Sequence, residues 1–250
     1  MEDRPEGAPD PPPPSSQWAT GLPPGGGGYE EPPPPSEPPA LPPLPWEDPG
    51  RPWPGALFAT VALIFQQPGQ AFERMPVTGD LLRPLMFPVL VQWPLFIVLG
   101  LFALAMRGSL GNEFPSGSPV LRYEDMYFRL MPVFVLLAPL WILVGTLINA
   151  AIRHLFLMLV GGAKRGFQAT LRTVCYATAG MLLGVIPCLG GLIAFVANAA
   201  FEIIGLSAAH RITKGRAALA VVLPGLFCCV CFAFLLVMIQ LAGSHYAGSR

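Results

Sequence analysis

The chain has 250 residues, 53% of them hydrophobic and only 12% charged, with 31 prolines and no formal net charge at pH 7. These numbers exclude one uniform domain, because proline at this frequency breaks the helices that so apolar a chain would form. Twenty of the prolines lie in residues 1–54, together with nine acidic residues and two arginines. This segment is therefore negative and the remainder positive, although the sum is zero.

Residues 1–54 contain almost no branched aliphatic side chains, so they cannot bury enough apolar surface to offset the entropy of ordering. Proline runs at 11–14 and 32–35 favour polyproline II, and the glycines at 25–28 form a flexible joint. We predict a disordered, proline-rich, acidic cytosolic arm that is unlike a secretory signal. Three tryptophans in it are candidate anchors for a partner protein or contacts with the membrane surface: Trp18, Trp46 and Trp53.

The remaining residues, 55–245, contain apolar stretches long enough for transmembrane helices, which need about 20 residues to cross roughly 30 Å of hydrocarbon. One stretch, from Val174 to Ala209, is too long for a single crossing. Pro187 and Gly190 interrupt it, which indicates two helices joined by a tight turn. We therefore predict an all-α integral membrane protein with five transmembrane helices, at about 84–106, 131–152, 174–187, 190–209 and 217–242.

Two shorter segments are candidates for interfacial helices. The apolar run at 56–65 is too short to cross a bilayer and suits a helix lying in the interface. Between the second and third predicted spans, Phe167, Leu171 and Val174 fall on one helical face, with basic residues beside or opposite it. A plain solvated loop is the alternative for this second segment. The candidate lipid-surface contacts there are Lys164, Arg165, Phe167 and Arg172.

Basic residues are distributed unequally on the two sides of five such spans. Eleven fall on the side of the N-terminus and four on the other side. Because cytoplasmic loops carry an excess of lysine and arginine, we predict a cytosolic N-terminus and a C-terminus outside the cytosol.

The sequence contains no recognisable motif for catalysis or metal binding. Its histidines, His154, His210 and His245, are far apart, and the cysteines at 228–231 lack the further ligands that a tetrahedral metal site needs. No nucleophile elbow or phosphate-binding glycine loop occurs either. We therefore expect no enzymatic activity, no catalytic residue, no metal and no cofactor, and we expect the cysteines to pack within membrane helices.

Glu202 is the acidic residue inside a predicted span. An ionisable group at membrane depth is costly and marks a functional or pairing site. Its expected partners are Asn198 on the same helix and Asn149 or Arg153 across helices. Structural pairing is favoured over an ion pathway, because transporters place several such residues near the midplane. A protonated Glu202, or one that snorkels toward the cytosolic side, is the alternative.

Small residues in the third predicted span indicate close helix packing. Gly180 and Gly184 are four residues apart, so they lie on one helical face and allow a neighbouring backbone to approach. This packing serves contacts either within the bundle or between chains.

Several short sequence elements, in this order and spacing, resemble the Yip domain family. The resemblance covers about residues 65–240 and matches the family's plan of five helices after a cytosolic N-terminus. The residues that carry it are Pro68 and Phe72 within FQQPGQAF, His154, Gly161, Gly162, Tyr176, Pro187 and His210.

The resemblance implies a non-enzymatic membrane protein. Eukaryotic members of the family are Golgi and endoplasmic-reticulum proteins that bind Rab-type GTPases and help to form transport vesicles, whereas prokaryotic members have no settled biochemical role. The short proline-dominated arm and compact loops look more like the prokaryotic branch. We therefore expect a bacterial inner membrane.

Two hypotheses for function remain. The first is a membrane adaptor or organiser whose interfacial segments contact the bilayer while the arm recruits a cytosolic protein. The second is a small transporter or channel subunit that uses Glu202 with Asn149, Asn198 and Gln92. The hypotheses differ in whether these polar side chains line one wet passage or pack with Glu202 paired. The expected partners are the lipid bilayer and a cytosolic protein, with homo- or hetero-oligomers left open and no nucleic acid.

Overall fold

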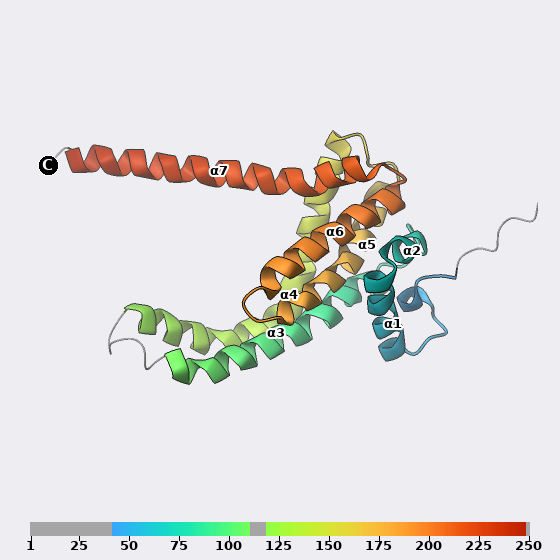
Figure 1. The fold of residues 1–250 in the computed structure, drawn as a ribbon, viewed down its shortest axis with the longest axis horizontal. Coiled ribbons are helices and arrows are strands. Elements are labelled where there is room, and N and C mark those ends of the chain that lie inside the picture. Colours follow the sequence, from blue (N-terminus) through green and yellow to red (C-terminus); the bar gives the residue numbers. More distant parts are fainter. Residues whose placement is uncertain (1–41, 111–118, 249–250) are drawn as a thin grey trace, which may run out of the picture. The chain divides into compact units, whose positions relative to one another are not determined.

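The computed structural model describes residues 42–110 and 119–248, with side chains over 42–107 and 125–240. Every regular element in these ranges is a helix (Figure 1). The chain divides into two compact units, Met1–Ala40 and Leu41–Arg250, and the described helices all belong to the second. The predicted disordered arm therefore lies outside the described residues as far as residue 41.

The segment that follows residue 41 is folded, which corrects the prediction that disorder extends to residue 54. It contains a single 3-10 turn, η1 (Pro45–Glu47), and buries Leu44 and Trp46. The backbone N–H of Trp46 donates to Thr60 Oγ1 at 2.8 Å, and its indole N–H donates to the carbonyl of Arg83 at 2.6 Å. Composition averages over a whole segment, whereas one anchored aromatic side chain is enough to order the end of it.

Two short helices come next. The first, α1 (Trp53–Gln66), buries Ala56, Thr60 and Ile64, which are spaced four apart on one face, and exposes Trp53 and Phe58. It covers the apolar run predicted at 56–65 and is too short to count as a membrane span. The second, α2 (Pro68–Glu73), begins with proline at its first position, where the missing N–H costs nothing.

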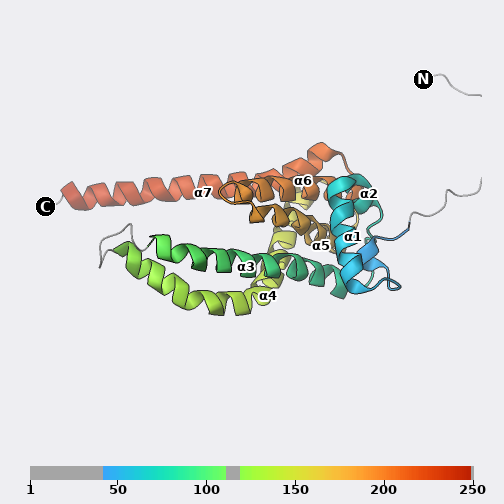
Figure 2. The same ribbon diagram turned by 60° about the horizontal axis from the view of Figure 1, so that its bottom comes forward.

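The long helices α3 (Leu82–Leu110) and α4 (Pro119–Leu159) run side by side over much of their length (Figures 1 and 2). Pro132 and Pro139 lie inside α4, which bends strongly. Because Pro139 has no N–H, the carbonyl of Val135 lacks its usual helical donor. The indole N–H of Trp93 on α3 donates to that carbonyl at 2.9 Å, which ties the two helices together at the proline.

The third predicted span has a different form in the structure. An α-helix, α5 (Gly166–Ala177), continues without a loop into a 3-10 helix, η2 (Thr178–Val185). The expected surface helix and the expected span at 174–187 are therefore parts of one rod. All residues from Ala169 to Gly180 are buried, so α5 is not an amphipathic surface helix. Thr170 and Arg172 bond to side chains of other elements, and Thr173 donates to the carbonyl of Ala169 in its own helix.

A tight turn joins η2 to α6 (Gly190–His210), as the sequence predicted. Cys188 in this turn has a φ of 65°, a left-handed value that is uncommon for a residue with a side chain. A Cβ on Gly190 would lie 2.8 Å from the carbonyl oxygens of Leu183 and Gly184, so the reversal leaves room only for glycine there.

The last helix, α7 (Lys214–Gly248), is packed only near its start. Ala217, Ala220 and Val221 are buried against Leu157 of α4 and Leu206 of α6. Beyond residue 221 its described side chains are mostly exposed and apolar, and in both views the helix extends away from its neighbours (Figures 1 and 2).

Four helices of the described residues are long and apolar enough to cross a membrane: Leu82–Arg107, Asp125–Leu159, Gly190–His210 and Lys214–Gln240. They correspond to four of the five predicted spans. The fifth, at 174–187, falls on the rod of α5 and η2. Its change from α to 3-10 geometry at residue 178 leaves neither part with the length of a span.

Candidate functional site

Glu202 lies at the centre of a buried polar cluster between α4 and α6. Its side chain is fully buried. One carboxylate oxygen, Oε2, accepts a hydrogen bond from Arg153 Nε at 2.7 Å. The other, Oε1, accepts from Asn149 Nδ2 at 3.1 Å and from Asn198 Nδ2 at 2.9 Å. The structure thus brings Glu202 together with all three partners named from the sequence.

Arg153 connects this cluster to a third helix. Its Nη1 donates to the backbone carbonyl of Val221 on α7 at 2.6 Å. The carbonyl that Pro224 leaves without a helical donor is that of Ala220, so Arg153 binds the carbonyl of the next residue in the chain. A single guanidinium therefore joins α4, α6 and α7, and removing its carboxylate partner would leave a buried charge without compensation.

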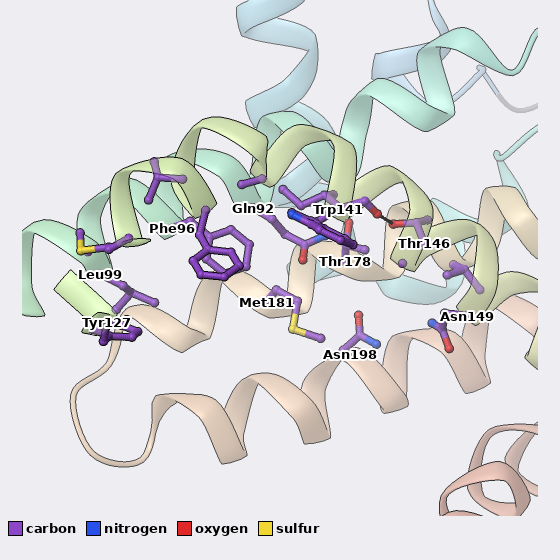
Figure 3. A pocket seen from close by; sticks show the side chains of 18 residues that line it. Gln92, Phe96, Leu99, Tyr127, Trp141, Thr146, Asn149, Thr178, Met181 and Asn198 are labelled. Carbon is purple, nitrogen blue, oxygen red and sulfur yellow. Dashed lines mark hydrogen bonds between the residues drawn. The ribbon is translucent and has the colours of Figure 1, made fainter. Parts of the chain in front are cut away.

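An elongated cavity of about 630 Å³ lies beside the cluster (Figure 3). Helices α3 and α4 form one wall, and α5, η2 and α6 form the other. Asn149 and Asn198 line its polar end, and Gln92 lines it from α3, whereas Glu202 and Arg153 do not line it. The three amides therefore line one cavity, whereas the ion pair of Glu202 and Arg153 lies outside its lining.

A chain of hydrogen bonds links two of the histidines at the other end of α6. The backbone N–H of Arg165 donates to His210 Nδ1 at 3.2 Å. A neutral imidazole then carries its proton on Nε2, which lies 2.9 Å from Thr170 Oγ1. The threonine hydroxyl is left to donate to His154 Nδ1, also at 2.9 Å. Both histidines thus act as structural links between α4, α5 and α6.

A second buried ion pair fixes the folded end of the N-terminal segment. Arg172 on α5 is 1% exposed, and its Nη1 donates to Glu47 Oε1 at 2.7 Å. The same oxygen accepts a hydrogen bond from the Tyr176 hydroxyl, and Arg172 Nη2 donates to the carbonyl of Asp80. Burial raises the pKa of the Glu47 carboxyl, while the Tyr176 hydrogen bond and the Arg172 charge pull that pKa down.

Arg83, at the start of α3, completes this attachment. Its Nη1 donates to the carbonyls of Trp46 and Asp48 at 3.0 and 2.9 Å. Together with the Trp46 bonds, these contacts hold residues 44–48 against α1, α3 and α5. We call residues Leu44 to Asp48 the anchor segment.

The four expected lipid-contact residues separate into two groups. Lys164 and Phe167 are exposed and Arg165 is half-buried, all near the start of α5. Arg172 corrects the prediction, because its guanidinium is enclosed and paired with Glu47. Sequence reasoning missed this pair, since Glu47 is 125 residues away and lies in a tract with the composition of a disordered arm.

Of the two glycines expected to allow close packing, only one is in tight contact. A Cβ added to Gly180 would lie 2.6 Å from the backbone nitrogen of Asn198, so η2 and α6 meet there backbone to backbone. At Gly184 the nearest atom, in the Leu95 side chain, would be 3.6 Å away, an ordinary contact.

The residues of the family-like pattern occupy structural positions. Pro68 starts α2, and Phe72 packs against Gly205 of α6, where a Cβ would be 2.8 Å from the phenyl ring. Gly161 has a φ of 66° just after α4, and Gly162 fits closely beside Leu157 and Ile212. The others are already placed: Tyr176 bonds Glu47, Pro187 is in the tight turn, and His154 and His210 are linked through Thr170.

Among the described residues, no three His, Cys, Asp or Glu side chains lie close enough together to hold a metal ion. Cys228, Cys229 and Cys231 are exposed on the apolar part of α7, and Cys175 is buried in α5. These placements do not test the predicted absence of a cofactor.

Apolar helices of spanning length, packed around buried polar groups, define a helical multi-pass membrane protein. The chain matches the Yip1 domain over residues 62–236, more than half of its length. It therefore belongs to the Yip1 domain family, as its short sequence elements predicted. No curated protein and no solved structure matches the chain.

Proposed function

We propose that the protein is a non-enzymatic adaptor or organiser of a membrane, acting as trafficking-associated members of its family do. In this proposal the membrane domain is a five-helix anchor, and residues 1–40 recruit a cytosolic partner. A bacterial inner membrane, with the N-terminus in the cytosol, is the proposed location.

The observation that carries this proposal is the anchor segment. A flexible arm would not need buried contacts where it joins the membrane domain. Here Trp46 and Glu47 form five hydrogen bonds with α1, α3 and α5. These bonds fix the point on the membrane domain at which the preceding residues are attached.

The test is crosslinking and affinity capture from native membranes, comparing the full chain with a chain that lacks residues 1–40. Loss of specific partners only in the truncated chain would support the adaptor, whereas identical partner lists would remove the arm from the proposal. Glu47→Gln supplies a finer test, because it keeps the arm but weakens the anchor segment. Glu73→Gln is the matched control, since Glu73 is exposed on α2.

The proposal of five crossings rests on the length of the rod formed by α5 and η2. Twelve α-helical and eight 3-10 residues together extend about 34 Å. This is enough for roughly 30 Å of hydrocarbon. Five crossings also retain the unequal distribution of basic residues. Reporter fusions after residues 117, 166 and 215 and at the C-terminus test the topology, and a cytosolic signal at the C-terminus would contradict it.

A small transporter or channel subunit is the second candidate, favoured by the three amides that line one cavity. Against it, the polar end of the cavity leads to Glu202, which is fully buried and has hydrogen bonds to three side chains. An ion flux in reconstituted vesicles that Glu202→Gln abolishes, with folding unchanged, would favour transport over the organiser.

A further inference from the structure

The cavity between α3, α4, η2 and α6 has the size of a ligand site. Its volume of about 630 Å³ lies within the range of roughly 300–1,000 Å³ that small-molecule sites occupy. It runs along α4 from Tyr127 to Asn149, so it is long as well as roomy (Figure 3). Neither the family match nor the proposed adaptor role assigns a ligand to it.

Its lining favours a hydrocarbon chain and a neutral head group. Most lining side chains are apolar, and no Asp, Glu, Lys or Arg is among them. Phe96, Phe134 and Trp141 on its walls are about half exposed and belong to candidate membrane spans. The cavity is thus accessible from the apolar surface of these helices, where lipid is the natural occupant.

One atom at the polar end lacks a partner. Asn198 is 8% exposed, and its Oδ1 is a buried acceptor without a hydrogen bond among the described residues. The orientation of this amide is determined, because Nδ2 must face Glu202 Oε1, which accepts at 2.9 Å. In Figure 3 the oxygen of Asn198 is turned to the cavity. An unmade hydrogen bond of this kind is costly.

The nearby hydroxyl groups also act as acceptors toward a ligand. Thr146 Oγ1 donates to the carbonyl of Ile142 at 2.7 Å, and Thr178 Oγ1 donates to the carbonyl of Cys175 at 2.5 Å. Their single protons are therefore used, and only lone pairs remain. With Asn198 Oδ1, three polar atoms of the lining can only accept, so a head group that donates hydrogen bonds matches them, whereas the amides of Gln92 and Asn149 can donate or accept.

We propose that this cavity binds a neutral lipid whose head group carries a free hydroxyl, of which diacylglycerol is the simplest example. The hydroxyl donates to Asn198 Oδ1, the head group lies near Thr146 and Thr178, and an acyl chain follows α4 toward Tyr127. Neutrality of the head group follows from the uncharged lining.

The experiment uses the full chain in phosphatidylcholine nanodiscs with a diacylglycerol that carries a photoreactive group in one acyl chain. Labelled positions are mapped by peptide mass spectrometry, and we expect them on cavity residues of α4 and η2. Unlabelled diacylglycerol should compete. Its methyl ether, which differs only in lacking the donor, should compete about tenfold more weakly, the ratio for one neutral hydrogen bond.

Two glycine substitutions test the location without disturbing the Glu202 cluster. Gly145 lines the cavity, and a Cβ added to it meets nothing within 4 Å, so Gly145→Leu adds its side chain at an open position of the lining. Gly225 on α7 is equally open but does not line the cavity, which makes Gly225→Leu the matched control. We expect Gly145→Leu to abolish the labelling and Gly225→Leu to leave it unchanged.

Three results would overturn the proposal. If the methyl ether competed as well as diacylglycerol, the hydroxyl group would not be donating a hydrogen bond to the protein. Labelling that Gly145→Leu leaves unchanged, or that falls only on the exposed part of α7, would mean general contact with surrounding lipid.

Discussion

Helices α6 and α7 are neighbours in the chain and both are candidate spans, yet they differ in hydropathy and in burial. The apolar window of α6 has a mean hydropathy of 1.9 and is 39% buried, whereas that of α7 has 2.8 and is 6% buried. The more hydrophobic helix is therefore the less packed one. In water the order would be reversed, but lipid removes the hydrophobic drive between helices and leaves small and polar residues to mark the packed faces.

The largest expected effect comes from the charge at the centre of the packed side. Glu202→Ala removes the carboxylate and leaves Arg153 unpaired among α4, α6 and α7, so we expect a loss of about 3–5 kcal/mol in the free energy of unfolding. Denaturation in detergent micelles measures it. Glu73→Ala on α2 is the control and should change the value by less than about 0.5 kcal/mol. Similar losses in both variants would contradict the paired role of Glu202.

A smaller loss is expected at the anchor segment. Glu47→Gln weakens the bonds from Arg172 and Tyr176, and hydrogen bonds to charged groups contribute about 1.5–3 kcal/mol. We expect a loss near 2 kcal/mol and faster proteolytic cleavage around residues 42–52. Limited proteolysis of the full chain in nanodiscs measures the second effect. Unchanged cleavage would mean that the other contacts of Trp46 and Arg83 are sufficient.

The two glycines of η2 sharpen the comparison on the packed face of α6. Gly180→Ala would force a methyl group against the Asn198 backbone, which cannot move aside cheaply, so we expect a loss of about 1–2 kcal/mol. Gly184→Ala has ordinary space and the same change in helix propensity. The difference between the two melting temperatures in detergent isolates the close approach, and equal values would show that η2 moves away from α6.

The smallest effects are expected within α7, where the same substitution can be made at a packed and at an exposed position. Val221 is 5% exposed, and Val221→Ala should lose about 1 kcal/mol of packing. Val230 is 67% exposed, and Val230→Ala should stay within about 0.5 kcal/mol. Matched unfolding curves in micelles compare them. A larger loss at Val230 would indicate that a further protein surface covers the outer part of α7.

Much of this arrangement was predictable because a membrane-spanning helix needs a long apolar run, which is visible in the sequence. Four spans, the turn at Pro187 and the surroundings of Glu202 follow from apolar runs broken by proline, glycine or a single charge. The partners of Glu202 were also foreseeable, because few polar residues occur at comparable depth.

The errors have one physical cause. Arg172 looked like a surface cation because periodicity describes a helix by itself, and nothing local reports that Glu47 reaches it from another segment. Leu44 and Trp46 looked disordered for the same reason. The transport hypothesis named the three amides that line the cavity, but the free oxygen of Asn198 was not predictable, because it depends on the hydrogen bond that the nitrogen of the same amide donates to Glu202.

Pro224 stands at the boundary between the packed and the exposed part of α7. The buried residues of α7 extend from Ala217 to Pro224, and the sixteen residues from Gly225 to Gln240 are all exposed over about 24 Å of helix. Each ten degrees of kink at the proline displaces the far end by about 4 Å. Arg153 binds the carbonyl of Val221 three residues before this proline, so the Glu202 ion pair holds the end of α7 from which the exposed half extends.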